Sequence, residues 1–162
     1  MTAENDQGRA FLRHALATLA YRGGKTLRGA SPEFATFRAS ETSRTPLEIL
    51  AHIGDLLEWA LSISQSKETW KNAETSGWDQ QVERFFTSLQ AFDDYLASAE
   101  PMGCSPTQLF QAPIADALTH VGQLAMLRRL AGIPMRGENY FKADIAVGRV
   151  GAEQSPPRRE FD

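Results

Sequence analysis

The chain has 162 residues, 42% of them hydrophobic and 23% charged, which is typical of one soluble domain with its own core. Its formal net charge of −3 and its scattered lysines and arginines exclude the basic patch that nucleic acids and anionic membranes require. No apolar run approaches the roughly 20 residues of a membrane span, and the first residues do not read as a signal peptide, so a cytoplasmic location is the default expectation.

Apolar periodicity predicts the first two helices. The first runs from about Asn5 to Tyr21 and is expected to stop at Gly23 and Gly24. The second has the clearest start in the chain, because Thr45-Pro46-Leu47-Glu48 combines a capping box with proline at the first helical position. Its apolar residues then fall on two adjacent stripes, which indicates a largely buried helix.

The second half of the chain predicts two more helices. The third is expected to open near Ser76 and to end before Pro101, with apolar residues spaced by four and three. The fourth is expected to start near Pro113 and to end before Gly132. No stretch alternates with period two for long enough to predict a sheet. The fold class is therefore all-α, with a four-helix bundle over residues 1–132 and an irregular C-terminal tail over residues 133–162.

Three candidate metal ligands lie on two of these helices. Asp116 and His120 are four residues apart, which places both side chains on one helix face. His52 lies on an apolar stripe, where an ionisable ring needs a partner. His52 is six residues past Pro46 and His120 seven past Pro113, so both lie at one depth if the second and fourth helices run parallel. The sequence predicts a divalent-metal site between these helices, about two turns inside one end of the bundle.

The segments Arg44–His52 and Asp116–Leu124 resemble the DinB-like (DinB/YfiT) metalloenzyme family. That family has one histidine in the second helix and a histidine pair, four residues apart, in the last bundle helix, followed by Gly-Gln. These three histidines bind a divalent metal. His52 and His120 match the first and last histidine, Gln123 matches the glutamine, and Asp116 replaces the middle histidine. The resemblance covers about residues 5 to 132 and implies a metal held by His52, Asp116 and His120.

The ligand set limits which metal ions could bind but does not identify one. Two histidines and a carboxylate suit zinc, and they are also the ligands of non-haem iron(II) oxygenases. Nickel and manganese accept the same set. We expect zinc or nickel first, with iron or manganese as alternatives.

Neighbouring residues have simpler interpretations beside the functional ones. His52 could be a core histidine bonded to a carboxylate such as Asp55, and Asp116 could only favour the start of its helix. Glu48 could be a fourth ligand, but the capping box already explains it. Gln123 and Asp55 are better placed to orient a ligating imidazole or a bound water.

The resemblance implies an enzyme, although it names neither a substrate nor a catalytic side chain. We expect a transferase that uses a low-molecular-weight thiol, or a hydrolase, because a bound divalent ion lowers the pKa of a thiol or water. The substrate would be a small molecule. The alternative is a non-catalytic bundle that binds a small molecule or partner, or serves a stress response, and whose metal site is vestigial.

The tail carries apolar side chains despite its prolines and glycines. They predict that the tail docks on the bundle, where it could cover the metal-site end, or on a second subunit, which would make the protein a homodimer. These side chains belong to Tyr140, Phe141, Ile145, Val147, Val150 and Phe161.

Overall fold

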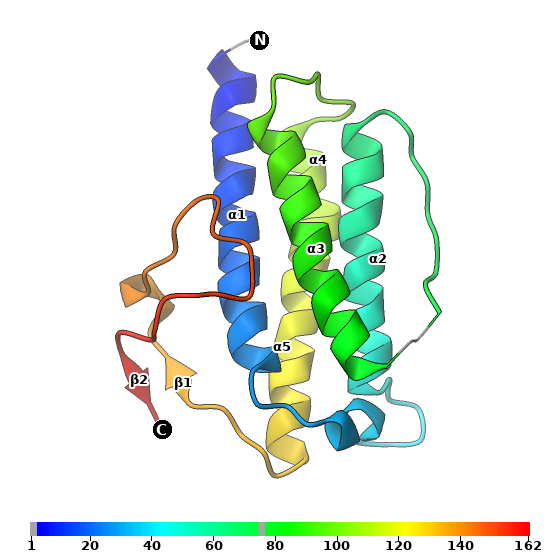
Figure 1. Ribbon diagram of the computed structural model, residues 1–162, viewed down its shortest axis with the longest axis vertical. Coiled ribbons are helices and arrows are strands. Elements are labelled where there is room, and N and C mark those ends of the chain that lie inside the picture. Colours follow the sequence, from blue (N-terminus) through cyan, green and yellow to red (C-terminus); the bar gives the residue numbers. More distant parts are fainter. Residues whose placement is uncertain (1–2, 75–76) are drawn as a thin grey trace.

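The computed structural model describes residues 3–74 and 77–162. Four long helices form a bundle, and an irregular tail follows them (Figure 1). This confirms the predicted all-α fold. The helical elements are α1 (Ala3–Leu27), a 3-10 turn (Pro32–Thr36), α2 (Pro46–Ser64), α3 (Trp78–Ala97), α4 (Pro106–Leu109), a π-helical turn (Phe110–Ile114) and α5 (Ala115–Leu130).

The start of α2 is the predicted capping box. The Thr45 hydroxyl accepts a hydrogen bond from the Glu48 amide at 3.2 Å, and the Glu48 carboxylate accepts one from the Thr45 amide at 2.7 Å. Pro46 occupies the first helical position, where its missing N–H costs nothing. The register of α2, and with it the position of His52, is therefore fixed by local sequence.

The direction of the helices differs from the expected alternation. Arg84, near the start of α3, binds Asp55 in the middle of α2, and Tyr95, near the end of α3, donates to the carbonyl of Ser64 at the end of α2. These two helices are therefore parallel. The described part of the connection between them, residues 65–74, returns along the bundle (Figure 1). Helix α5 runs in the opposite direction to α2 in the same figure, so these two helices are antiparallel and the prediction of a parallel pair is wrong.

Helix α1 continues to Leu27. The predicted stop at the two glycines is therefore wrong. A Cβ atom on Gly23 would lie 2.5 Å from Cζ of Phe85, a ring buried in the core. Glycine therefore allows α1 and the Phe85 ring of α3 to approach each other closely at this point. Its low helix propensity, about 1 kcal/mol against alanine, is offset by this packing.

The last bundle helix begins earlier than expected. Ser105 caps it, with its hydroxyl accepting from the Gln108 amide, and Pro106 takes the first helical position. Pro113, the expected start, lies instead inside the π-helical turn that joins α4 to α5. In an α-helix the proline ring would press on the carbonyl of Leu109, and the wider turn relieves that clash.

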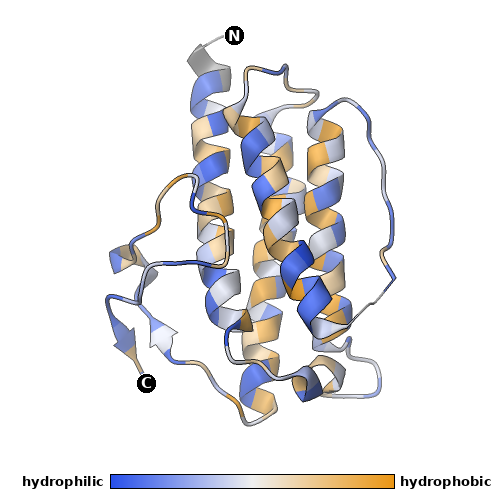
Figure 2. Ribbon diagram, in the orientation of Figure 1, coloured by the Kyte–Doolittle hydropathy of each residue, from blue (hydrophilic) through white to orange (hydrophobic). Residues whose placement is uncertain are grey.

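The third helix ends at Ala97, before Pro101 as predicted, and in the described residues it begins at Trp78. Ser76, its expected start, lies outside the described residues. The core contains apolar side chains from all the long helices, whereas residues 65–74 of the connection to α3 are mainly hydrophilic (Figure 2). Within residues 3–74 and 77–162, no helix has both the length and the apolar character needed to cross a membrane.

The tail packs along α1, away from α2. It forms a two-stranded antiparallel ladder of β1 (Gly137–Glu138) and β2 (Glu160–Phe161), in which Glu138 faces Glu160. Lys25 of α1 lies between these carboxylates, 2.7 Å from an oxygen of each, and Tyr21 donates to Glu138 at 2.6 Å. We call these four side chains the tail cluster. The positive charge of Lys25 offsets the repulsion between the carboxylates of Glu138 and Glu160, which would otherwise destabilise the ladder.

The predicted docking of apolar tail residues is confirmed in part. Val150 is fully buried and Ile145 packs partly buried against the core. Phe141, Val147 and Phe161 remain 89%, 49% and 53% exposed. The tail lies beside α1, on the other side of the bundle from α2 (Figure 1).

Candidate metal centre

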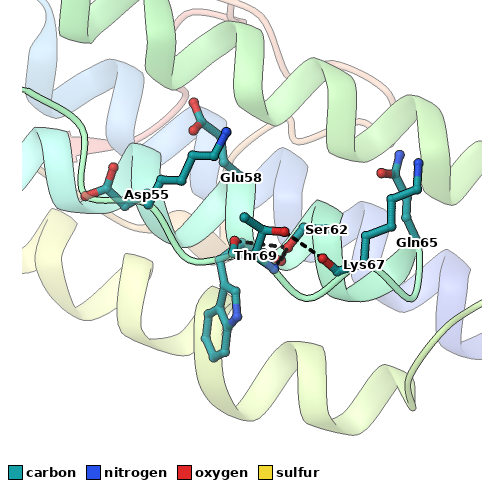
Figure 3. A pocket seen from close by; sticks show the side chains of 8 residues that line it. Asp55, Glu58, Ser62, Gln65, Lys67 and Thr69 are labelled. Atoms are coloured by element: carbon teal, nitrogen blue, oxygen red, sulfur yellow. Dashed lines mark hydrogen bonds between the residues drawn. The ribbon is translucent and has the colours of Figure 1, made fainter.

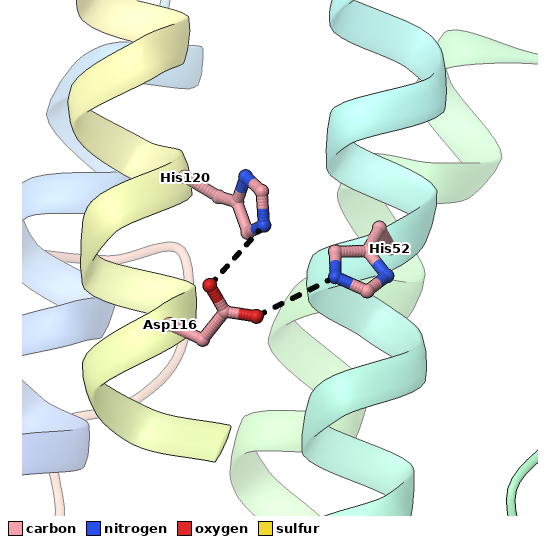
Figure 4. A group of neighbouring side chains, drawn as sticks. All are labelled: His52, Asp116 and His120. Atoms are coloured by element: carbon pink, nitrogen blue, oxygen red, sulfur yellow. Dashed lines mark ion pairs between the residues drawn. The ribbon is translucent and has the colours of Figure 1, made fainter. Parts of the chain in front are cut away.

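His52, Asp116 and His120 meet in the groove between α2 and α5 (Figure 4). We call them the triad. The Asp116 carboxylate lies between the two rings, 3.6 Å from Nε2 of His52 and 3.4 Å from Nε2 of His120. The rings meet edge to face, with centroids 4.8 Å apart. The three residues predicted as ligands are therefore together, although the expected helix start and direction were both wrong.

The position of each side chain follows from its helix. His52 lies six residues into α2 and His120 ten residues before the end of α5 at Leu130, and the antiparallel packing of the two helices brings their ring centroids to 4.8 Å from each other. Asp116 and His120 are one turn apart on the same face. The site thus remains near the end of the bundle where α2 begins.

The spacing of the donor atoms fits a divalent ion. One nitrogen of each ring and one carboxylate oxygen lie within 4.8 Å of one another. Two tetrahedral ligands of one ion, each about 2.1 Å from it, are roughly 3.4 Å apart, and the contacts of the two Asp116 oxygens, one with each histidine, are of similar length. These contacts are also longer than the usual N–H···O hydrogen bond of about 2.7–3.2 Å.

Exposure leaves one side of the triad open. The side chains of His52 and His120 are 23% and 11% exposed, whereas that of Asp116 is 46% exposed. An ion held by three protein ligands at such a place keeps positions for water or a substrate, which is what distinguishes catalytic zinc sites from structural ones. The arrangement can therefore serve both binding and chemistry.

The electrostatics keep His52 in the form that binds metal. Burial lowers the pKa of His52, and the nearby His120 and Arg44 lower it further as like charges. Asp116 opposes these effects without cancelling them. The imidazole is therefore neutral near pH 7, with a nitrogen lone pair available as a ligand.

Gln123 orients the second histidine, as its position in the sequence suggested. Nδ1 of His120 lies 2.9 Å from Oε1 of Gln123, so the ring donates its Nδ1 proton to the amide oxygen. Nε2 is then the unprotonated nitrogen, and it is the one that faces Asp116. This hydrogen bond selects the tautomer needed for ligation.

Two tryptophans extend the group of aromatic rings beside His52. Trp70, from the 65–77 connection, contacts the ring of His52 edge to face at 5.9 Å between centroids, and Trp59 contacts Trp70 at 5.6 Å. Trp70 remains 44% exposed. Its segment has no periodicity, so the only sequence signal was an aromatic residue in a polar connection.

Two other suggested neighbours lie elsewhere. Asp55 binds Arg84 and the amide of Ala73, so it is not the partner of His52. Glu48 remains in its capping box and pairs with Arg38. Neither joins the triad.

A separate hollow of about 210 Å³ lies between α2 and the 65–77 connection (Figure 3). Its two carboxylates, Asp55 and Glu58, already bind Arg84. Ser62 exchanges hydrogen bonds with the backbone of Thr69. The hydrogen bonds beside this hollow therefore attach the connection to α2, and that attachment holds the segment carrying Trp70.

Cys104 is partly buried, and burial raises the pKa of its thiol. The thiol is thus protonated near neutral pH and is a poor nucleophile. This side chain offers no alternative centre of chemistry.

Comparison of the chain with known protein families, with curated proteins and with solved structures found no match.

Proposed function

We propose that the protein is a DinB-like metalloprotein that binds one divalent ion through His52, Asp116 and His120. We further propose that it acts on a small molecule as a thiol-dependent transferase or as a hydrolase. The observation that supports this most directly is the position of Asp116, whose carboxylate lies at ligand spacing from both histidines and is still half exposed. Gln123, at the family's position, supports it further through its bond to His120.

The ion would supply one thing, a lowered pKa for a thiol or water at its open side. The chain's own residues supply the rest. Gln123 retains the Nδ1 proton of His120, and Asp116 contributes the negative charge that a divalent cation requires. Trp70 shields His52 from water on one side, so the approach is from the groove beside Asp116.

The decisive experiment measures metal content and stoichiometry in protein prepared without chelator or a nickel column. We expect one ion per chain in the wild type and none in His52→Ala or His120→Ala. His14→Ala is the matched control, since His14 is exposed on α1 and remote from the triad. Full occupancy in the double variant His52→Ala/His120→Ala would refute the site.

Two substitutions of Asp116, with opposite expected effects on metal affinity, test whether its carboxylate is a ligand. Asp116→Asn should lose most of the affinity, because it removes the charge that balances the cation. Asp116→His, which restores the usual family set, should retain zinc. Normal metal binding by Asp116→Asn would mean that the carboxylate serves only the helix.

Activity is tested by screening metal-loaded protein against electrophiles, with a low-molecular-weight thiol, and against esters. We expect turnover that disappears with EDTA and returns with one divalent ion. If metal binds stoichiometrically and nothing is turned over faster than by free ion, the protein is a non-catalytic binding module. That was the alternative expected from the sequence.

A further inference from the structure

The groove between α2 and α5 is hollowed on both sides of the triad. One hollow, of about 430 Å³, includes Asp116 itself together with Trp59. The other, of about 550 Å³, includes Gln123, which binds His120. Thr119 lines both, so the two hollows adjoin. The volume of the second is that of a typical small-molecule site. We call it the Met126 hollow; its lining includes Arg44, Ile49, Thr119, Gln123, Met126 and Leu127.

The floor of the Met126 hollow is apolar. Ile49 and Leu127 are buried beneath it, at 3% and 7% exposure, and Met126 stands 57% exposed at its side. Methionine is unbranched and polarisable, so it adapts to apolar ligands of varied shape. An aliphatic or aromatic arm placed here would be removed from water on one face.

Charge in the Met126 hollow has a single sign. Arg44 is the one charged residue in its lining. Within the described residues, no carboxylate forms an ion pair with Arg44. The start of α2 at Pro46, two residues further along the chain, adds the positive end of a helix dipole.

We propose that the Met126 hollow binds an amphipathic organic anion: its carboxylate pairs with Arg44 and its apolar arm lies on Ile49, Met126 and Leu127. This inference rests on the proposed function, because it names the substrate class for the same site. A guanidinium binds a carboxylate through two parallel hydrogen bonds, which fixes the anion's orientation. The rest of the molecule then extends along the groove toward Asp116.

The test compares 4-phenylbutyrate with 4-phenylbutanol, which share the apolar arm and differ in charge. Both are titrated by calorimetry into metal-free protein in a buffer without phosphate. The acid should bind about tenfold tighter than the alcohol, and Arg44→Gln should remove most of that preference. Arg129→Gln, which changes the same charge outside the hollow on α5, should leave it intact.

A second variant tests the apolar arm. Met126→Ser should weaken both ligands to a similar degree, and because Met126 is exposed the fold should be retained. Equal affinity for acid and alcohol, an unchanged preference in Arg44→Gln, or no binding of either ligand at millimolar concentration would each overturn the proposal. These measurements need no metal. They therefore fail or succeed separately from the stoichiometry experiment on the triad.

Discussion

The tail cluster and the triad are both groups of ionisable side chains, but their surroundings differ. In the tail cluster Lys25 and Glu138 are 8% and 0% exposed, and their contacts measure 2.7 Å or less. In the triad the Asp116 carboxylate is 46% exposed, and its contacts measure 3.4 and 3.6 Å. The Lys25–Glu138 pair is buried and held by short hydrogen bonds, whereas the triad is open and its contacts leave room for a further atom.

This difference separates stability from function. A closed cluster gains nothing from a ligand, and the loss of one partner leaves a buried charge uncompensated. An open cluster of two imidazoles and one carboxylate costs little to maintain and can still bind a cation. A substitution in the tail cluster should therefore lower stability and leave metal binding intact. A substitution of Asp116 in the triad should remove metal binding with little loss of stability.

The largest effect expected is on stability. Glu138→Ala should lower the free energy of unfolding by about 3 kcal/mol, because Tyr21 and Lys25 each lose a buried partner. Asp116→Ala should change it by less than about 1 kcal/mol, since its contacts are long and exposed. Urea unfolding of the two metal-free variants makes the comparison, and equal losses would contradict it.

The next effect is the stabilisation by a bound metal ion, and here the triad substitution should have the larger effect. A divalent ion at about 100 times its Kd should stabilise the wild type by about 2.7 kcal/mol, or about 5–10 °C in melting temperature for a chain of this length. Glu138→Ala should show the same increment from its lower baseline. Asp116→Asn should show almost none, and differential scanning fluorimetry with and without ion would reveal it.

A smaller effect concerns the hydrogen bond that orients His120. Gln123→Ala should weaken metal affinity about 10- to 100-fold without abolishing stoichiometric binding, because every ligand remains. Gln90→Ala, on the exposed face of α3, is the matched control. Competition with a chromophoric chelator measures both, and identical affinities would show that Gln123 plays no part in the site.

The smallest effect is a pH dependence that belongs to the tail cluster. Burial, then the Glu138 carboxylate, raises the pKa of Tyr21. For Lys25, burial lowers the pKa but the hydrogen bonds to Glu138 and Glu160 outweigh it, so its pKa is also raised. The folded protein therefore retains protons that the unfolded chain releases from about pH 10 upward. This contribution to stability is complete below that pH and is lost above it. Melting curves from pH 8 to 11 should fall more steeply for the wild type than for Tyr21→Phe/Lys25→Met.

Local signals in the sequence predicted part of this molecule correctly. The capping box at Thr45 fixes one helix start by itself, and the spacing of Asp116 and His120 fixes their shared face. Ser105-Pro106-Thr107-Gln108 carries the same type of signal and begins the last bundle helix, whereas the sequence prediction places that start near Pro113. A local signal for the correct start was therefore present.

Long-range packing explains what the sequence could not show. Gly23 resembles a helix terminator until Phe85 is found against it, and the direction of α3 depends on how residues 65–74 run along the bundle. Trp70 lies outside any periodic segment, so only the folded chain brings it to His52. The triad was predicted because its spacing within α5 survives errors in helix start and direction.

The π-helical turn before α5 also acts as a one-residue insertion. Each residue advances an α-helix by about 100°, so the wider turn rotates everything after it relative to α4. Removing one residue, such as Ala112, would by itself place Pro113 in a regular helix, where its ring clashes with a carbonyl one turn earlier, so the deletion would have to be combined with Pro113→Ala. The regular helix would then rotate Asp116 and His120 by about 100° away from α2 without changing either side chain. The direction of these two side chains thus depends on how many residues precede them in the helix as much as on their identity.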